Sequence, residues 1–161
     1  MTAEFPGLAS FAGPRVHHAG VTVSDLDTSA EFYQDLLGGS RFGPYERSGP
    51  RIDAVTGYVG AVVRQVFLTA ADGSTMVELL QYVGGSADVL EPDNGTVGAV
   101  HIALTVDDLD AALARARERG YVALSDPIPA SPPMTGCRVV YMLDPDRVRV
   151  ELVELPRRTL A

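Results

Sequence analysis

Several features that define other classes of protein are missing from this chain. It has no tryptophan and a single cysteine, Cys137, so it cannot form an internal disulfide and a reducing cytoplasm is the expected compartment. No apolar run approaches the roughly 18 residues that a membrane-spanning helix needs, so no membrane association is expected. The first residues lack the basic start and long apolar centre of a secretory signal. We interpret residues 1–15 as an N-terminal tail.

Positive charge is also scarce. The chain has 13 Lys and Arg against 21 Asp and Glu, which gives a formal net charge of −8. Such an acidic surface repels phosphate backbones, so nucleic acid is not an expected partner. An anionic small molecule is not excluded, because a local group of arginines can still attract it.

What the chain does contain is an internal repeat. The stretch "VHHAGVTVSDLD" at 16–27 is echoed by "AVHIALTVDDLD" at 99–110, with His18 and His101 at the same place in each copy. Both copies change at the same point from the alternation of a strand to the apolar spacing of a helix. The duplication therefore predicts two modules with the same order of elements.

Each module is expected to run strand, helix and then about three strands. The helices are predicted at 24–39 and 107–120, where Ser24 or Asp25 can cap the first helix and Gly38 can end it. Further strands are predicted by alternating apolar residues. They are expected at 40–45, 61–70, 75–82, 121–128, 137–144 and 148–155.

The predicted fold class is α+β, with two βαβββ modules in tandem at 16–83 and 99–155. Residues 84–98, rich in Gly and Asp, are predicted as a linker, and 156–161 as a C-terminal tail. An insertion near 46–60 lengthens the first module. It could be a loop over a site or a plain connection.

Strand alternation places the histidines on the face opposite the apolar residues. His18 shares a face with Gly20 and Thr22, and the apolar residues between them are expected to lie under the helix. The second copy repeats this pattern around His101. His17 is interpreted as a structural residue on the core face or at the edge.

A glutamate interrupts the last apolar strand of each half, Glu78 in "MVELLQY" and Glu151 in "RVELVEL". An isolated carboxylate is expensive to bury without a partner. If the two sheets face each other across a pseudo-two-fold axis, two imidazoles and two carboxylates converge, a set that suits a divalent transition metal. The structural alternative is that the histidines bond the backbone and the glutamates pair with Arg64 or Arg149.

These motifs resemble the vicinal oxygen chelate superfamily, which includes glyoxalase I, methylmalonyl-CoA epimerase, extradiol dioxygenases, fosfomycin-resistance enzymes and bleomycin-binding proteins. The resemblance covers 16–154 and lies in "HHAGVTVSDLDTSAEFYQDLLG", "VELLQY", "VHIALTVDDLDAALARARERG" and "DPDRVRVELVE". It implies that the two sheets form a shared metal-binding cleft, and it favours a homodimer. In one departure, Arg147 replaces the usual glycine after "DPD", which is expected to alter the turn.

The resemblance implies His18, Glu78, His101 and Glu151 as ligands of a divalent ion, Zn, Ni, Co, Mn or Fe. This set looks like that of bacterial-type glyoxalase I and is close to that of methylmalonyl-CoA epimerase, which implies a metal-dependent lyase or isomerase. The implied reaction abstracts a proton next to a carbonyl of a small-molecule substrate, with the metal stabilising an enediolate. Glu151 is the implied base and Glu78 the symmetric alternative.

Two other function classes stay open. One is an Fe(II)-dependent extradiol-type dioxygenase, although a fourth protein ligand would crowd the position that dioxygen needs. The other is a metal-free protein that binds a small molecule or drug, although such members generally lack the ligand set. Met134 and Cys137 are expected near the mouth of the cleft, and five arginines are candidates for holding an anionic substrate: Arg41, Arg47, Arg51, Arg64 and Arg138.

Overall fold

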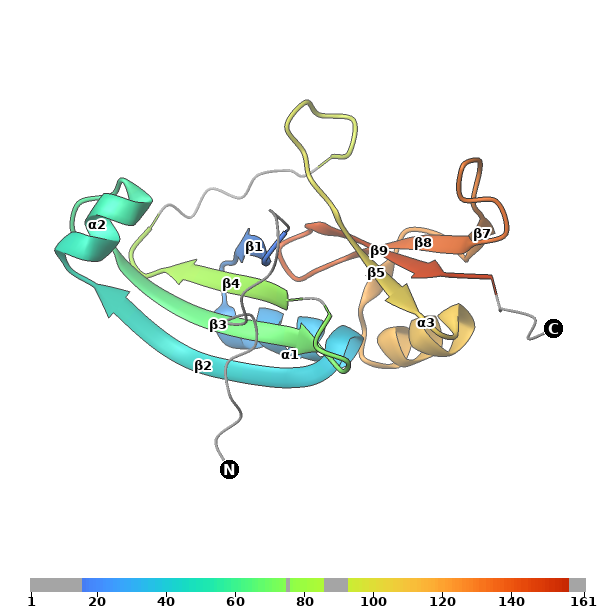
Figure 1. The fold of residues 1–161 in the computed structure, drawn as a ribbon, viewed down its shortest axis with the longest axis horizontal. Coiled ribbons are helices and arrows are strands. Elements are labelled where there is room, and N and C mark those ends of the chain that lie inside the picture. Colours follow the sequence, from blue (N-terminus) through green and yellow to red (C-terminus); the bar gives the residue numbers. More distant parts are fainter. Residues whose placement is uncertain (1–15, 75, 86–92, 157–161) are drawn as a thin grey trace, which may run out of the picture. The chain divides into compact units, whose positions relative to one another are not determined.

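The computed structural model describes residues 16–74, 76–85 and 93–156. The chain divides into two compact units, Met1–Asp88 and Val89–Ala161 (Figure 1). The predicted N-terminal tail, much of the predicted linker and nearly all of the predicted C-terminal tail lie outside the described residues. Within the described ranges, no helix has the length and apolar character needed to cross a membrane.

The first unit contains β1 (Ala19–Thr22), α1 (Leu26–Leu37), β2 (Gly38–Ser48), α2 (Pro50–Thr56), β3 (Val62–Ala70) and β4 (Met76–Tyr82). Its strands form one sheet in the order β1-β4-β3-β2. The first strand is parallel to the last, and the other neighbours are antiparallel. This order brings the start of the module beside its end, which matters for the site.

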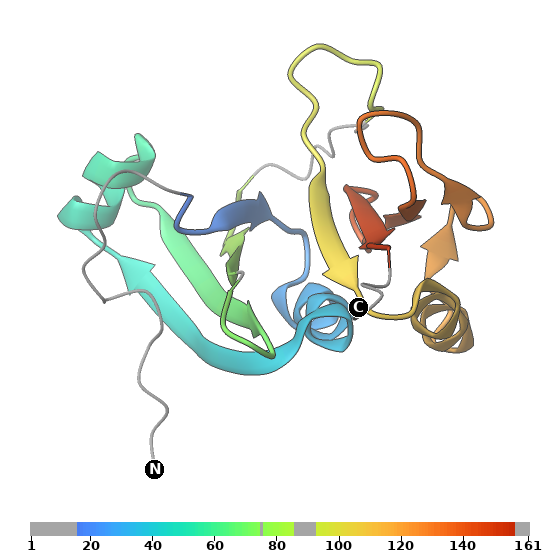
Figure 2. The ribbon, with the colours of Figure 1, turned by 45° about the vertical axis from the view of Figure 1, so that its right-hand side comes forward.

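The second unit contains β5 (Ile102–Val106), α3 (Leu109–Glu118), β6 (Val122–Ala123), β7 (Ile128–Pro129), β8 (Arg138–Leu143) and β9 (Arg149–Glu154). The sheet order β5-β9-β8-β6 repeats that of the first unit, with β7 also paired to β8. Figure 2 shows the two sheets and their helices from a second angle. The predicted α+β class with repeated modules is confirmed. The predicted strand at 121–128 is instead two short strands, separated by bends at 124–126 and then by Pro127, which cannot donate to a ladder.

The core of each unit lies between the helix and the apolar face of its sheet. Val21 and Val23 are buried while Gly20 and Thr22 are exposed, as the alternation of β1 predicts. Each fully buried aliphatic side chain contributes about 1.5–3 kcal/mol of transfer free energy. The fully buried large side chains include Leu26, Phe32, Tyr33, Val66, Leu68, Val77, Leu79, Leu109, Val140, Met142, Val150 and Leu152.

The helix ends follow the predicted signals. Asp25, rather than Ser24, caps α1, and its carboxylate accepts the N–H of Thr28 at 2.8 Å. Gly38 ends α1 in the left-handed conformation, with φ of 66°. In the second unit Asp108 caps α3 in the same way. Such side-chain caps stabilise a helix by about 1 kcal/mol each.

The insertion of the first module is a connection that contains a helix. Strand β2 continues to Ser48, and α2 then begins with Pro50 at its first position and stops at Gly57. The carboxylate of Asp53 accepts the N–H groups of Gly60 and Ala61, which closes the connection to β3. A helix this short carries little apolar periodicity, so the sequence pattern did not predict it.

The turn between β8 and β9 contains the unusual arginine. Arg147 has φ of 68°, the left-handed region that favours glycine. The Asp144 carboxylate holds the turn by accepting the N–H groups of Asp146 and Val148 at 2.9 and 2.7 Å. The arginine therefore adopts the conformation that a glycine would have at this position. The expected change in the turn is not seen.

Candidate metal centre

The first histidine–glutamate pair forms because β1 lies parallel to β4. Gly20 is opposite Glu78 in the register of these strands, and His18, two residues earlier, is on the same face. His18 Nε2 lies 3.0 Å from Glu78 Oε2. The glutamate side chain is largely buried, with 13% of its surface exposed, so the imidazole meets a carboxylate that is mostly removed from water.

The second unit repeats the pair. Ala103 is opposite Glu151 on the parallel strands β5 and β9. His101 Nε2 lies 3.3 Å from Glu151 Oε2, and 15% of the glutamate side chain is exposed. The sequence repeat therefore produces the same contact twice, once in each unit.

An aromatic ring accompanies each pair, and the sequence analysis did not identify it. Phe67 is opposite Glu78 on β3, and its ring meets the His18 ring edge-on, with centroids 6.1 Å apart. Tyr141 is opposite Glu151 on β8, and its ring lies 5.4 Å from that of His101. The sequence could have indicated these rings, because alternation along β3 and β8 puts them on the face of the glutamates.

The polar neighbours of the two pairs differ. Gln65 Nε2 donates a hydrogen bond to Glu78 Oε1 in the first unit. In the second unit the Tyr141 hydroxyl lies 3.5 Å from His101 Nε2. Burial raises the pKa of Tyr141, the charge of Glu151 adds to this, and the charge of Arg149 opposes it. Sequence reasoning missed Gln65 because an isolated glutamine carries no motif.

His17 was predicted on the core face or at the edge, and the core-face alternative is wrong. Its side chain is exposed, and its Nδ1 lies 2.8 Å from the Nδ1 of His18. His17 lies before β1 begins at Ala19, in a stretch that is exposed from Val16 to His18. One of the two nitrogens must carry a proton for this contact to be a hydrogen bond.

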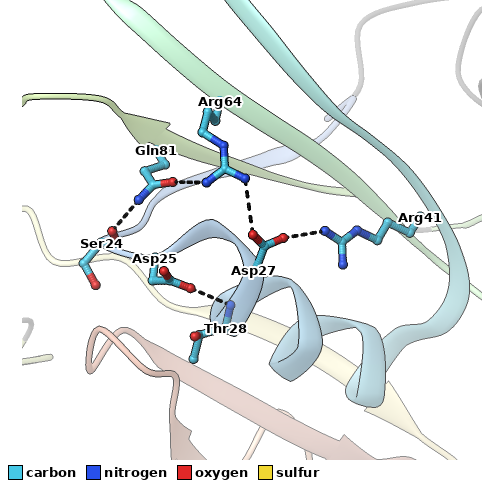
Figure 3. A network of polar contacts seen from close by, with 7 residues as sticks. All are labelled: Ser24, Asp25, Asp27, Thr28, Arg41, Arg64 and Gln81. Carbon is cyan, nitrogen blue, oxygen red and sulfur yellow. Dashed lines mark hydrogen bonds and ion pairs between the residues drawn. The ribbon is translucent and has the colours of Figure 1, made fainter.

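The structural alternative predicted that Arg64 pairs with Glu78, and the structure shows a different partner. Arg64 is on the helix-facing side of β3, with Val66 and Leu68, and its guanidinium donates to Gln81 at 2.9 Å and Asp27 at 3.2 Å (Figure 3). Alternation along β3 turns it away from the face of the histidine–glutamate pair.

Arg41 joins the same cluster by donating to Asp27 at 3.0 Å (Figure 3). The hydrogen bonds from Arg41 and Arg64 lower the pKa of Asp27. Gln81 also donates to the backbone oxygen of Ser24 at 2.7 Å, just before α1 begins. The cluster thus ties the N-terminus of α1 to β2, β3 and β4.

The second unit repeats this cluster around Arg138. Its guanidinium makes two bonds of 2.8 Å to Asp110 and one of 3.1 Å to Glu154, and the bonds from Arg138 lower the pKa of Asp110. Three of the five predicted anion-binding arginines, Arg41, Arg64 and Arg138, are thus engaged with carboxylates at helix starts. That prediction is wrong for them because it considered their position along the chain and not their strand face.

The remaining predicted residues have varied surroundings. Arg47 lies over the Tyr45 ring, 4.8 Å from its centroid. Arg149, which shares a strand face with Glu151, forms an ion pair with Asp93 at 3.8 Å rather than with the glutamate. Cys137 is buried with a free thiol, and Met134 is exposed.

The histidine and glutamate atoms fit a metal in type and spacing. Two ligands at right angles on an ion with bonds of about 2.1 Å lie about 3 Å apart, close to the separation in both pairs. Within the described residues, no group of three or more His, Cys, Asp or Glu side chains is close enough to hold an ion. Each unit alone therefore supplies half of the predicted set, and convergence of the halves stays a prediction.

Comparison with known proteins identifies the family of this chain. Residues 17–141 match the Glyoxalase/Bleomycin resistance protein/Dioxygenase superfamily. A 2-epi-5-epi-valiolone epimerase from an Actinomyces species is 28% identical over 145 residues, covering 88% of this chain and 79% of the relative.

Solved structures share the fold. A glyoxalase family protein from Bacillus cereus superposes with a TM-score of 0.79 at 20% identity, covering 92% of this chain and 99% of that chain. The trypanothione-dependent glyoxalase I of Leishmania major gives a TM-score of 0.57 at 20% identity, with coverage of 88% and 87%. The family match spans most of the chain and includes His18, Glu78 and His101, and it ends before Glu151. This chain belongs to the glyoxalase/bleomycin resistance protein/dioxygenase superfamily.

Proposed function

We propose that the protein is a divalent-metal-dependent isomerase or lyase that abstracts a proton next to a carbonyl, in the manner of glyoxalase I or an acyl-CoA epimerase. One observation carries the proposal: each unit brings one imidazole and one largely buried carboxylate into contact. An epimerase among the relatives and a glyoxalase I among the structural neighbours support this reaction class.

The metal ligands in this proposal are His18, Glu78, His101 and Glu151, and the ion is Zn, Ni, Co, Mn or Fe. When bound, the metal supplies Lewis-acid polarisation of the substrate carbonyl. The imidazoles must be neutral to bind the ion, and a proton on His18 Nδ1 or His17 Nδ1 completes their 2.8 Å contact. His17 would then hold the ring of His18 in its binding orientation.

Proton transfer is assigned to a glutamate. The carboxylate of Glu151 takes the proton from the carbon beside the carbonyl, so the C–H bond breaks and its electron pair moves toward the carbonyl oxygen. The same group returns the proton to a carbon of the product. Glu78 is the symmetric alternative, because it makes the same contact with its own histidine.

The substrate is proposed to be a small molecule that can carry negative charge. Arg149 shares the strand face of Glu151, and it is the arginine best placed for an anionic group in the second unit. We also propose a cytoplasmic homodimer, since members of this superfamily often form dimers.

The decisive test joins metal content to hydrogen exchange. The wild-type protein should retain close to one divalent ion per proposed site and should exchange the α-proton of a suitable substrate in D₂O, measured by NMR. The substrates to screen are hydroxyacyl compounds, thiohemiacetals and acyl-CoA thioesters. His101→Ala should lose both the metal and the exchange, because it removes one of the proposed ligands.

Glu31→Gln is the matched control, since it removes an exposed carboxylate of α1 and should retain metal and exchange. Absence of exchange across all three substrate classes would contradict the proposal. Oxygen uptake with a catechol and Fe(II) would assign the dioxygenase alternative. Purified protein that binds a small molecule but no metal would assign the binding-protein alternative.

A further inference from the structure

The two glutamate sites differ at one equivalent position. On β3, Gln65 is opposite Leu80, two residues beyond Glu78. On β8, Val139 is opposite Val153, two residues beyond Glu151. Gln65 and Val139 therefore occupy the same place in their sheets, on the same face as the glutamate.

This difference changes the contacts of the two carboxylates. Glu78 is engaged through both oxygens, because Oε1 accepts the hydrogen bond of Gln65 and Oε2 meets His18. Glu151 meets His101 through Oε2, and Val139 offers its carboxylate no donor. A hydrogen bond from an amide restrains rotation of a carboxylate and stabilises its charged form. The first carboxylate is thus held at both oxygens, and the second is not held in this way.

We propose that Gln65 is a positioning residue that fixes Glu78 as a metal ligand and leaves the proton transfer to Glu151. The inference rests on the proposed function and assigns different roles to the two related glutamates. A transferring carboxylate must exchange its partner for the substrate proton, which a second hydrogen bond opposes. A ligand carboxylate gains from the same bond, because partners of ligands fix their orientation.

The aromatic neighbours of the two histidines also differ between the units. Phe67 beside His18 has no polar atom, whereas Tyr141 beside His101 brings a hydroxyl to the face of Glu151. Arg149 adds a positive charge on that face. The second unit therefore places a hydroxyl and a guanidinium on the face of Glu151, the carboxylate that has no glutamine beside it.

The experiment substitutes Gln65 and Val139 in separate variants of the full chain. Val139→Gln introduces the amide beside Glu151, and Val139→Met is its apolar control of similar size. Gln65→Met removes the amide beside Glu78. The readouts are α-proton exchange at saturating metal and metal affinity, with Co(II) as the probe and a competing chelator.

Val139→Gln should lower the exchange rate at saturating Co(II) by about tenfold, the effect of one hydrogen bond to a charged group, and it should not weaken Co(II) binding. Val139→Met should change neither quantity more than about twofold. Gln65→Met should weaken Co(II) binding by roughly 10-fold or more, as expected for loss of a ligand's partner, and should retain the exchange rate once Co(II) is saturating.

Each arm can overturn the inference. Full exchange in Val139→Gln, or wild-type Co(II) affinity in Gln65→Met, would contradict it, as would loss of exchange in Gln65→Met with metal bound. Should Val139→Gln fail to fold by circular dichroism, the Gln65→Met arm decides alone. If the wild-type protein shows no exchange, the proposed function fails, and the Co(II) affinity of Gln65→Met still tests whether Gln65 positions Glu78.

Discussion

Arg147 has a backbone conformation that is unfavourable for a residue with a side chain. The left-handed region costs an L-residue roughly 1–2 kcal/mol relative to glycine. Hydrogen bonds from the turn to the Asp144 carboxylate hold the conformation, and Asp144 itself is buried, with 4% exposed. The turn between β8 and β9 is therefore maintained by its polar contacts despite the residue at this position.

At Arg147, a glycine variant should be more stable than an alanine variant, which reverses the usual order of stability. Arg147→Gly should be about 0.5–1 kcal/mol more stable than Arg147→Ala, because only glycine is unstrained at φ of 68°. Urea unfolding of the two variants measures the difference. Alanine equal to or better than glycine would show that the turn changes conformation in the variants.

At the residue scale the site also depends on small side chains. Gly20 and Ala103 stand opposite the two glutamates, and a Cβ at Gly20 would lie 3.5 Å from Glu78 Oε2. That is an ordinary contact, so alanine would fit there as it does in the second unit. A larger side chain at either position would instead occupy space beside the carboxylate.

At the scale of elements, each helix start is joined to its sheet by an aspartate–arginine contact. Asp27 in α1 meets Arg64 on β3, and Asp110 in α3 meets Arg138 on β8. Both aspartates lie in the first helical turn, where a negative charge also interacts favourably with the helix dipole. The repeat therefore includes a structural cluster as well as the candidate site.

The pH dependence of stability should report these clusters. The native pKa values of Asp27 and Asp110 are lowered from 3.8 by hydrogen bonds from arginine. Between the lowered native pKa values and the unfolded value of 3.8, the unfolded chain binds more protons than the native state. The free energy of unfolding therefore increases with pH across this range. The contribution is complete above the unfolded value and is lost as pH falls through the native values.

Urea unfolding at a series of pH values from about 6 to about 2.5 tests this. The Asp110→Asn variant should show a shallower fall in stability with acid than the wild type. The change should be modest because the Asp110 side chain is 67% exposed. Glu31→Gln should keep the wild-type slope, and equal slopes in all three proteins would mean that the cluster does not contribute.

At the scale of the whole molecule, the proposed ligands are divided between two units that each have their own core. His18 and Glu78 belong to the first unit, and His101 and Glu151 to the second. A ligand that binds only the native state stabilises it in proportion to the logarithm of its concentration relative to Kd. Metal bound to the proposed ligands would therefore stabilise the native state.

Removal of the metal should lower the thermal midpoint. At a metal concentration about 100 times Kd, chelation should reduce the midpoint of the wild-type protein by about 5 °C or more. His18→Ala and His101→Ala should each become insensitive to the chelator, because each removes a ligand from a different unit. Calorimetry with and without chelator measures this. A chelator effect that persists in His18→Ala would place the ion on the second pair alone.

Much of the fold followed from local patterns. Alternation predicted the buried Val21 and Val23, and the cap signals predicted Ser24 or Asp25 at the start of α1 and Gly38 at its end. The short helix α2 was not predicted, because seven residues give no clear apolar period. The arginine assignments failed for Arg64 because strand face, rather than position along the chain, decides which groups a side chain meets.

The amino-acid sequence by itself determined the duplicated order of elements, the face of His18 and His101 and the residue types of the proposed ligands. These depend on short-range periodicity, which the chain carries locally. Tertiary structure alone decided that Gln65 reaches Glu78, that Tyr141 approaches His101 and that arginines join the helix starts. The physical reason is that these contacts require a particular register between strands distant in sequence, and register is set by the packing of the whole sheet.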